Sequence, residues 1–126
     1  MANKMKLDVR KCWTAPEGQH VTVGHNRQIA RSVIDGFPIF TCYLHGSPVA
    51  RIKPHGASPT ATVTFDDCGY LTATTVKAMA EFAAAFGVHC GVSRAKGDLS
   101  VRWMQDGAWT ERKGPDGRIA FAADRY

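Results

Sequence analysis

The chain has 126 residues, of which 44% are hydrophobic and 21% are charged, and this composition is typical of a globular protein and excludes extensive disorder. The length suits one domain, residues 1–126, whose core needs no metal or disulfide support. There is no run of about 18 apolar residues, and no apolar segment follows the first basic residues, so we expect a cytoplasmic protein without a membrane span or a secretory leader. The net charge of +5 favours contact with phosphate or an acidic protein surface, and it equally suits solubility.

The first third of the chain is predicted to begin with two strands, an edge strand over Lys6 to Thr14 and a short strand over His20 to Val23. Asn26 is a candidate N-cap for a following helix of about two turns, which would end at Asp35-Gly36. The last residues of this segment are β-branched, which weakens the helix prediction.

The middle of the chain contains the strongest strand patterns. Phe37 to Leu44 is β-prone and apolar on both faces, which indicates a central strand. After a turn at His45 to Pro48, Val49 to Ile52 is predicted to return as its partner. Thr60 to Phe65 alternates threonine with apolar residues, which predicts a half-buried strand.

The clearest element is a helix over about residues 75–86. Thr74 or Thr75 is predicted to cap its first amides, and Gly87 is the expected stop. One apolar stripe follows the spacing i, i+3, i+4, i+7 and is predicted to pack in the core rather than to bind a cofactor. Its members are Met79, Phe82, Ala83 and Phe86.

The residues after the helix are predicted to form an antiparallel meander. Leu99, Val101 and Trp103 alternate inward, and Asp106-Gly107 is a strong two-residue hairpin signal. The predicted fold class is therefore α+β, an antiparallel sheet of about six strands with one main helix packed on one face.

The four cysteines lie at positions 12, 42, 68 and 90, and no two of them form a Cys-x-x-Cys pair. Structural zinc sites usually contain such local pairs. We therefore expect reduced thiols, no metal and no cofactor.

No catalytic motif is present: the chain lacks G-x-S-x-G, a phosphate-binding loop and H-E-x-x-H. The strongest candidates for a nucleophile and its general base are Cys68 and His89, which lie on either side of the helix. No known motif spacing supports this pairing. Asp66-Asp67 suits a turn by backbone hydrogen bonding alone. The prediction is that the protein is not an enzyme, with the Cys68–His89 pair kept as a distant third hypothesis.

Basic residues gather in and beside the predicted meander. Acidic residues are interleaved with them, and mixed signs are typical of an ordinary solvated surface. Trp103 is predicted to lie in the core, whereas Trp109, just after a hairpin tip, is predicted to be the more exposed tryptophan. The candidates for macromolecule binding are Arg94, Lys96, Arg102, Trp109, Arg112, Lys113 and Arg118.

Three segments in order, Tyr43 to Ile52, Ala61 to Phe65 and Asp67 to Thr75, resemble a family of small uncharacterised bacteriophage proteins. The family pattern is a strand ending in His-Gly and a small residue, a strand written T-x-T-L, then Gly with Trp or Tyr, T-x-T-T and a helix. The similarity covers roughly residues 37 to 105. The chain departs from the pattern at Lys77 to Glu81, where the family helix often has arginine, an aliphatic residue and asparagine. The family has no settled activity, so no functional residues are carried over.

The resemblance implies a phage or prophage origin and the cytoplasm of an infected bacterial host. The first functional hypothesis is a non-enzymatic accessory protein that binds a host protein or ribonucleoprotein complex and inhibits a host defence nuclease, as anti-CRISPR proteins do. The second hypothesis is a small basic DNA- or RNA-binding accessory protein. No membrane partner is expected, and the protein is predicted to be a monomer or a homodimer.

Overall fold

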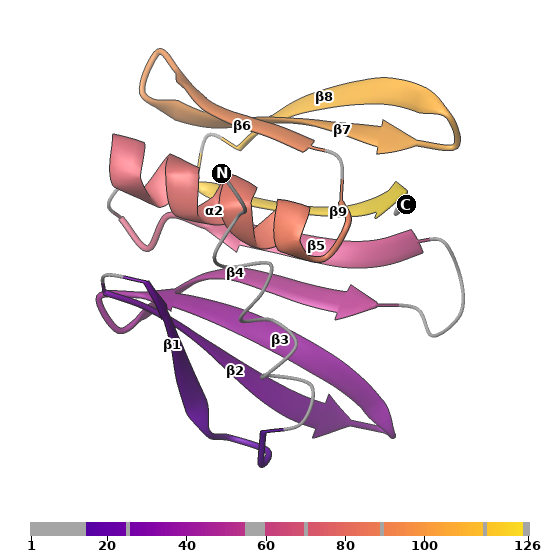
Figure 1. Cartoon of the computed structure of the whole chain (residues 1–126). Coiled ribbons are helices and arrows are strands. Elements are labelled where there is room, and N and C mark those ends of the chain that lie inside the picture. Colours follow the sequence, from indigo (N-terminus) through magenta and orange to yellow (C-terminus); the bar gives the residue numbers. More distant parts are fainter. Residues whose placement is uncertain are drawn as a thin grey trace.

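The computed structural model describes residues 15–24, 26–54, 60–69, 71–88, 90–114 and 116–124, which form an α+β fold (Figure 1). The larger sheet is antiparallel and has the strand order β1-β2-β3-β4-β5-β9, and the smaller sheet has the order β6-β7-β8. The predicted fold class is confirmed. The strands are β1 His20–Gly24, β2 Arg27–Ile34, β3 Phe37–Leu44, β4 Ser47–Pro54, β5 Thr60–Asp66, β6 Cys90–Ala95, β7 Asp98–Gln105, β8 Ala108–Gly114 and β9 Arg118–Asp124, and the helix is α2 Ala73–Ala85. The edge strand predicted over residues 6–14 lies outside the described residues.

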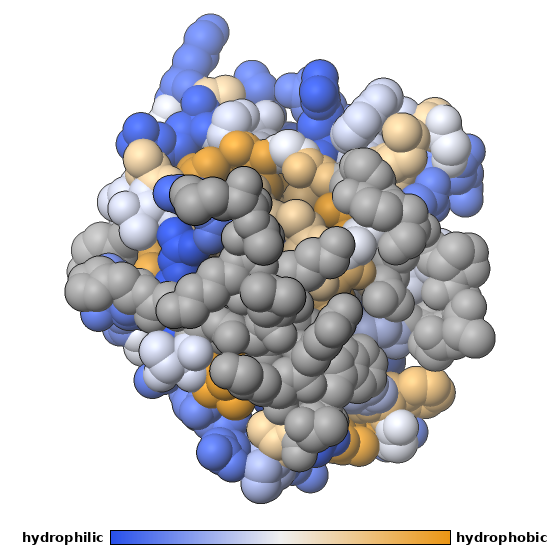
Figure 2. All heavy atoms as spheres, in the orientation of Figure 1, coloured by the Kyte–Doolittle hydropathy of each residue, from blue (hydrophilic) through white to orange (hydrophobic). Residues whose placement is uncertain are grey.

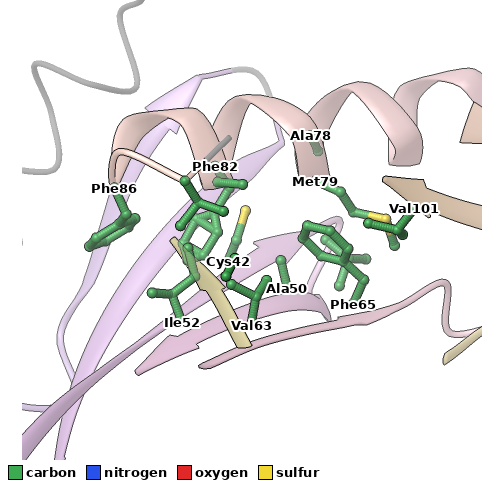
Figure 3. Close-up of a cluster of buried hydrophobic side chains, with 14 of the residues drawn as sticks. Cys42, Ala50, Ile52, Val63, Phe65, Ala78, Met79, Phe82, Phe86 and Val101 are labelled. Atoms are coloured by element: carbon green, nitrogen blue, oxygen red, sulfur yellow. The ribbon is translucent and has the colours of Figure 1, made fainter. Parts of the chain in front are cut away.

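Helix α2 covers one face of the six-stranded sheet by packing against β3 and β4. Its apolar stripe points onto the sheet as predicted: Phe82 is fully buried above Cys42 and Ile52, and Met79 is fully buried on the side of Phe65 and Val101 (Figure 3). Burial of such side chains contributes roughly 1.5–3 kcal/mol each. The stripe is therefore the main attachment of the helix to the sheet.

The predicted N-cap of this helix was wrong by two to three residues. Thr72 is the cap, because its backbone is extended while its Oγ1 accepts a hydrogen bond from the amide of Thr75 at 3.2 Å. Thr74 and Thr75 are already helical and cannot perform this role. Several threonines in succession made the sequence signal ambiguous.

The helix predicted to begin at Asn26 was also wrong, because residues 27–34 form strand β2. Asp35 and Gly36 have φ of +53° and +81°, which is the geometry of a two-residue hairpin turn rather than of a helix end. An Asp-Gly dipeptide can end a helix and can also form a two-residue hairpin turn. Full pairing of β2 with β3, from Arg27 opposite Leu44 to Ile34 opposite Phe37, decides in favour of the strand.

The C-terminal part is not one continuous meander. Strands β6, β7 and β8 form the smaller sheet, but β9 leaves it and pairs with β5 along its full length. Its inward residues Ile119 and Phe121 lie opposite Phe65 and Val63 of β5. Burial of these apolar pairs in the larger core explains why the last strand changes sheet.

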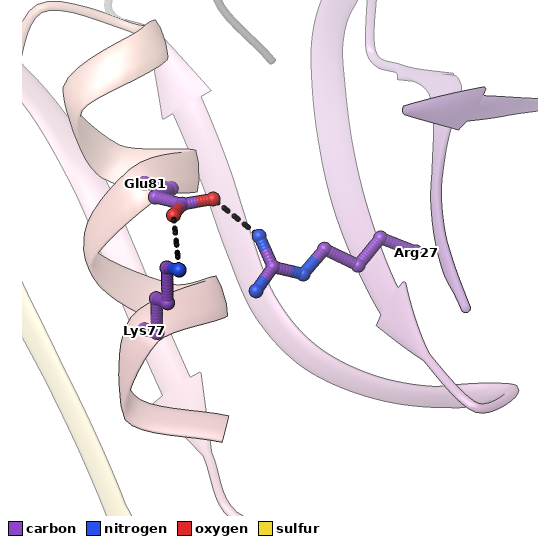
Figure 4. Close-up of polar contacts among 3 residues, drawn as sticks. All are labelled: Arg27, Lys77 and Glu81. Atoms are coloured by element: carbon purple, nitrogen blue, oxygen red, sulfur yellow. Dashed lines mark hydrogen bonds and ion pairs between the residues drawn. The ribbon is translucent and has the colours of Figure 1, made fainter. Parts of the chain in front are cut away.

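The two sheets share one core. The helix contacts β6 on one side, and β7 packs against β9. Trp103 of β7 stacks on Phe121 of β9 with ring centroids 4.5 Å apart, and buried residues of both sheets belong to one hydrophobic cluster. An ion pair between Arg27 of β2 and Glu81 of α2 ties the helix to the far side of the sheet, and Lys77 lies 3.9 Å from the same carboxylate (Figure 4).

Within the part of the chain that the structure describes, no helix has the length and apolar character needed to cross a membrane.

Candidate macromolecule-binding face

The three-stranded sheet has one face in the core and one face toward solvent. Strand pairing places Cys90, Leu99, Val101 and Trp103 on the inner face, where they are buried or half-buried. Neighbouring positions along each strand point to the opposite side. We call the exposed side the outer face, and it consists of Gly91, Ser93, Ala95, Asp98, Ser100, Arg102, Met104, Trp109, Glu111 and Lys113.

The outer face carries a pair of side chains in cation–π contact, near the β7–β8 turn. Trp109 is 54% exposed, and the Cζ atom of Arg102 lies 5.0 Å from the centroid of its ring. Such a contact holds a guanidinium in place by cation–π attraction of about 0.5–1 kcal/mol at an exposed site. The pair therefore presents an ordered flat surface that combines an aromatic ring with hydrogen-bond donors.

A shallow groove lies beside this pair. It has a volume of about 350 Å³ and is lined by Gly91, Val92, Ser93, Ser100, Arg102 and Glu111. The residues of β6 in the groove are small, and a Cβ atom built on Gly91 meets no neighbour within 4 Å. The hydroxyl of Ser100 donates toward Glu111 Oε1 at 3.4 Å, so the carboxylate is held on the groove wall. The groove thus offers donors from Arg102 and an acceptor from Glu111 to an incoming chain.

The structure brings together three of the seven candidate residues. Arg102, Trp109 and Lys113 share the outer face. Arg94 and Arg112 lie on the other side of the same sheet, where Arg112 covers the Trp103 ring at 5.4 Å and donates to the carbonyl of Ala120 at 3.4 Å.

The two remaining candidates lie elsewhere. Lys96 is in the β6–β7 turn, and Arg118 is on the larger sheet opposite Asp66. The seven residues therefore do not form one basic patch.

The two tryptophan predictions in this region are confirmed. Trp103 is 1% exposed and donates from Nε1 to Gln105 at 3.2 Å, whereas Trp109 is open to solvent. None of the groove residues Ser100, Glu111 and Gly91 was among the candidates named from the sequence. The alternation of β6, β7 and β8 indicates that they share one face, but the groove itself depends on how the strands pair.

A second hollow lies at the start of α2. It has a volume of about 480 Å³, and apolar atoms make up most of its wall. We call it the helix-start pocket, and it is lined by Leu44, His45, Ser47, Val49, Asp67, Cys68, Thr72, Thr74 and Thr75.

The surroundings of Cys68 do not favour a reactive thiolate. Burial raises the pKa of the Cys68 thiol, and the carboxylates of Asp66 and Asp67 raise it further. These two carboxylates also accept the amides of Cys68 at 2.9 Å and Gly69 at 2.8 Å, which is the turn role that the sequence suggested. A nucleophilic cysteine needs the opposite environment, in which its pKa is lowered. His89, the partner considered from the sequence, lies outside the described residues.

Cys42, Cys68 and Cys90 are free thiols. Burial raises the pKa of Cys90 to about 12, and it raises the pKa of Cys42 to about 12 despite the nearby Arg27 guanidinium. Among the described residues, no three histidine, cysteine or acidic side chains gather as metal ligands. The expectations of no metal and no cofactor stay predictions.

No protein-family model matches this chain, and no curated protein and no solved structure matches it either.

Proposed function

We propose that this is a non-enzymatic accessory protein that binds a protein partner through the outer face of the β6–β8 sheet. The observation that carries the proposal is the exposed Trp109 with Arg102 stacked on its ring. Tryptophan and arginine are the residues most enriched among the energetic centres of protein interfaces.

The surroundings of the pair support a protein partner. Met104 adds a half-buried adaptable side chain, and Glu111 and Lys113 give the rim both signs of charge. Aromatic residues, methionine and arginine at the centre with polar residues around them are the usual anatomy of such interfaces. The acidic group beside the pair is unfavourable for a surface that only follows phosphates.

The partner class rests on the resemblance to small phage proteins, which suggests a host defence nuclease complex and an inhibitory role. The test is a pull-down from bacterial lysate treated with a nuclease that removes DNA and RNA. We expect the wild-type protein to retain one defined protein complex and the Trp109→Ala and Arg102→Ala variants to lose it.

The matched control is Arg118→Ala, which removes the same charge from a different sheet and should retain the complex. Loss of the complex with this control would show that overall charge, rather than the outer face, drives binding. Recovery of only abundant ribosomal proteins by the wild type would contradict the proposal.

A second candidate function is single-stranded nucleic-acid binding, and the specific observation in its favour is Lys113 on the same face as the Arg102–Trp109 stack. Bases stack on exposed aromatic rings for about 1–3 kcal/mol each. Fluorescence anisotropy of a labelled oligothymidine at increasing salt tests it. Affinity that falls steeply with salt and is lost in Trp109→Ala would support this function, because each phosphate contact releases counterions. Absence of binding at low salt would exclude it.

A further inference from the structure

The β2–β3 hairpin has an exposed apolar tip. Val33, Ile34 and Phe37 are 39%, 52% and 46% exposed, and with Trp109 they are the exposed large hydrophobic residues of the described chain. Ile34 and Phe37 lie directly opposite each other beside the turn at Asp35-Gly36. Figure 2 shows hydrophobic atoms at the lower right, where β2 ends and β3 begins in Figure 1. This tip is separate from the outer face of the β6–β8 sheet.

The tip extends beyond the neighbouring strands. β4 pairs with β3 only as far as Phe40 opposite Ile52, and β1 pairs with β2 only as far as His20 opposite Ala30. Two hydrogen bonds from the preceding loop hold the free edge of β2: the amide of Gly18 donates to Arg31 at 2.9 Å, and the amide of Val33 donates to Glu17 at 3.0 Å. The tip is therefore an ordered projection whose backbone is satisfied but whose apolar side chains remain in water.

The helix-start pocket lies at the opposite end of the same strand. Leu44 lines it and is seven positions from Phe37, which corresponds to roughly 23 Å along a strand. Its volume of about 480 Å³ is within the range of pockets that accept a drug-sized group, about 300–1,000 Å³, so an aromatic and an aliphatic side chain fit. A tip and a pocket separated in this way cannot meet within one molecule.

The tip and the pocket are complementary in polarity and in charge. The tip offers Phe37 and Ile34, and the Nζ atom of Lys53 lies over the Phe37 ring at 5.4 Å. Apolar atoms make up most of the pocket wall, which includes the buried side chains of Leu44 and Val49, and Asp67 also lies on this wall. Docking would remove exposed apolar surface from water, which contributes roughly 25 cal/mol per Å², and would bring Lys53 toward a carboxylate.

We propose that the β2–β3 tip of one copy of this chain docks into the helix-start pocket of a second copy. The contact uses two different surfaces, so it is heterologous, and the dimer keeps one free tip on one copy and one free pocket on the other. Association is therefore concentration-dependent and continues beyond the dimer to rings or short filaments. It does not depend on the proposed partner of the outer face.

Sedimentation velocity from micromolar to millimolar protein tests the proposal. We expect the average mass of the wild type to rise with concentration beyond that of a dimer. Phe37→Asp, which spoils the tip, and Thr74→Trp, which fills the pocket from an exposed position, should each remain monomeric. An equimolar mixture of the two variants should form a one-to-one dimer that grows no further, because it contains one intact tip and one intact pocket.

Several outcomes would overturn the proposal. A wild-type protein that is monomeric at every concentration would overturn it. Self-association of either variant alone would also overturn it, because such association would indicate tip-to-tip or pocket-to-pocket contact. Loss of association in the control Trp109→Ala would indicate general adhesion of exposed hydrophobic residues. Wild type that stays monomeric in solution but sediments with phosphatidylglycerol vesicles would assign the tip to a lipid surface instead.

Circular dichroism melting of each variant shows whether it folds. If either variant fails to fold, Ile34→Asp replaces the tip variant and Ser47→Trp replaces the pocket variant. The same sedimentation results then support or overturn the proposal.

Discussion

The inner and outer faces of the β6–β8 sheet carry two tryptophans with opposite surroundings. Trp103 is 1% exposed and stacks on Phe121, and Trp109 is 54% exposed and holds Arg102 against its ring. They lie on neighbouring strands, Trp103 on the central strand β7 and Trp109 on the edge strand β8, and they occupy opposite sides of the sheet. The same residue type packs in the core on one face and is proposed to bind a partner on the other, so substitutions should separate the two effects.

The largest expected effect is on the inner face. Trp103→Ala should lower the free energy of unfolding by about 3–5 kcal/mol, because it leaves a cavity where β7 meets β9. Chemical denaturation measures this change, and Trp103→Phe should recover part of it. A loss below about 1 kcal/mol would show that the two sheets do not share a core.

The next effect concerns the turn that leads from one tryptophan to the other. Asp124 of β9 accepts the amides of Asp106 at 3.2 Å and Gly107 at 3.0 Å, which fastens the β7–β8 turn to the larger sheet. Asp124→Ala should lower the free energy of unfolding by about 1–3 kcal/mol, since hydrogen bonds to a charged group are lost. Asp124→Asn keeps one acceptor oxygen and should cost less, and an unchanged stability of Asp124→Ala would mean that the contact is not made in solution.

The inner face should also make stability depend on pH. Burial raises the pKa of Cys90 from its ordinary value of 9.0 to about 12. Below pH 9 the thiol is neutral in both states and contributes no pH dependence. Between pH 9 and 12 only the unfolded chain ionises there, so the free energy of unfolding falls as pH rises, by about 1.4 kcal/mol per pH unit. Denaturation at several pH values should show a shallower fall in Cys90→Ala, and an unchanged slope would contradict the burial of this thiol.

The smallest stability effect is expected on the outer face. Trp109→Ala should change the free energy of unfolding by less than about 1 kcal/mol, because only the exposed cation–π contact is lost. The same substitution should abolish partner capture. A large loss of stability would place Trp109 in the core and remove the distinction between the faces.

Local patterns predicted most of the elements. The alternation of residues 60–65 placed Ala61, Val63 and Phe65 inward, and all three are fully buried. The stripe on α2 and the hairpin at Asp106-Gly107 were also predicted, the latter with φ of +52° and +80°. These features depend on residues within one turn or one strand, which is why the sequence reveals them.

The errors arose where a local signal fits two structures. Asp35-Gly36 suits the end of a helix and a hairpin turn, and only the pairing of β2 with β3 decides between them. The basic residues of the C-terminal part were predicted as one group, but the strand pairing divides them among different faces. The apolar tip at Ile34 and Phe37 was not foreseen, because strand β2 was predicted as a helix.

The sequence by itself determined the α+β class, the main helix, the strand that precedes it and the contrast between the buried and exposed tryptophans, because periodicity and turn chemistry are local properties. Only the tertiary structure decided that β9 joins the larger sheet, that Arg102 lies against Trp109, and that an apolar tip and an apolar pocket occupy opposite ends of β3. These arrangements depend on pairing between segments far apart in the chain, and such pairing is selected by the burial of apolar surface in the whole molecule rather than by any short stretch of residues.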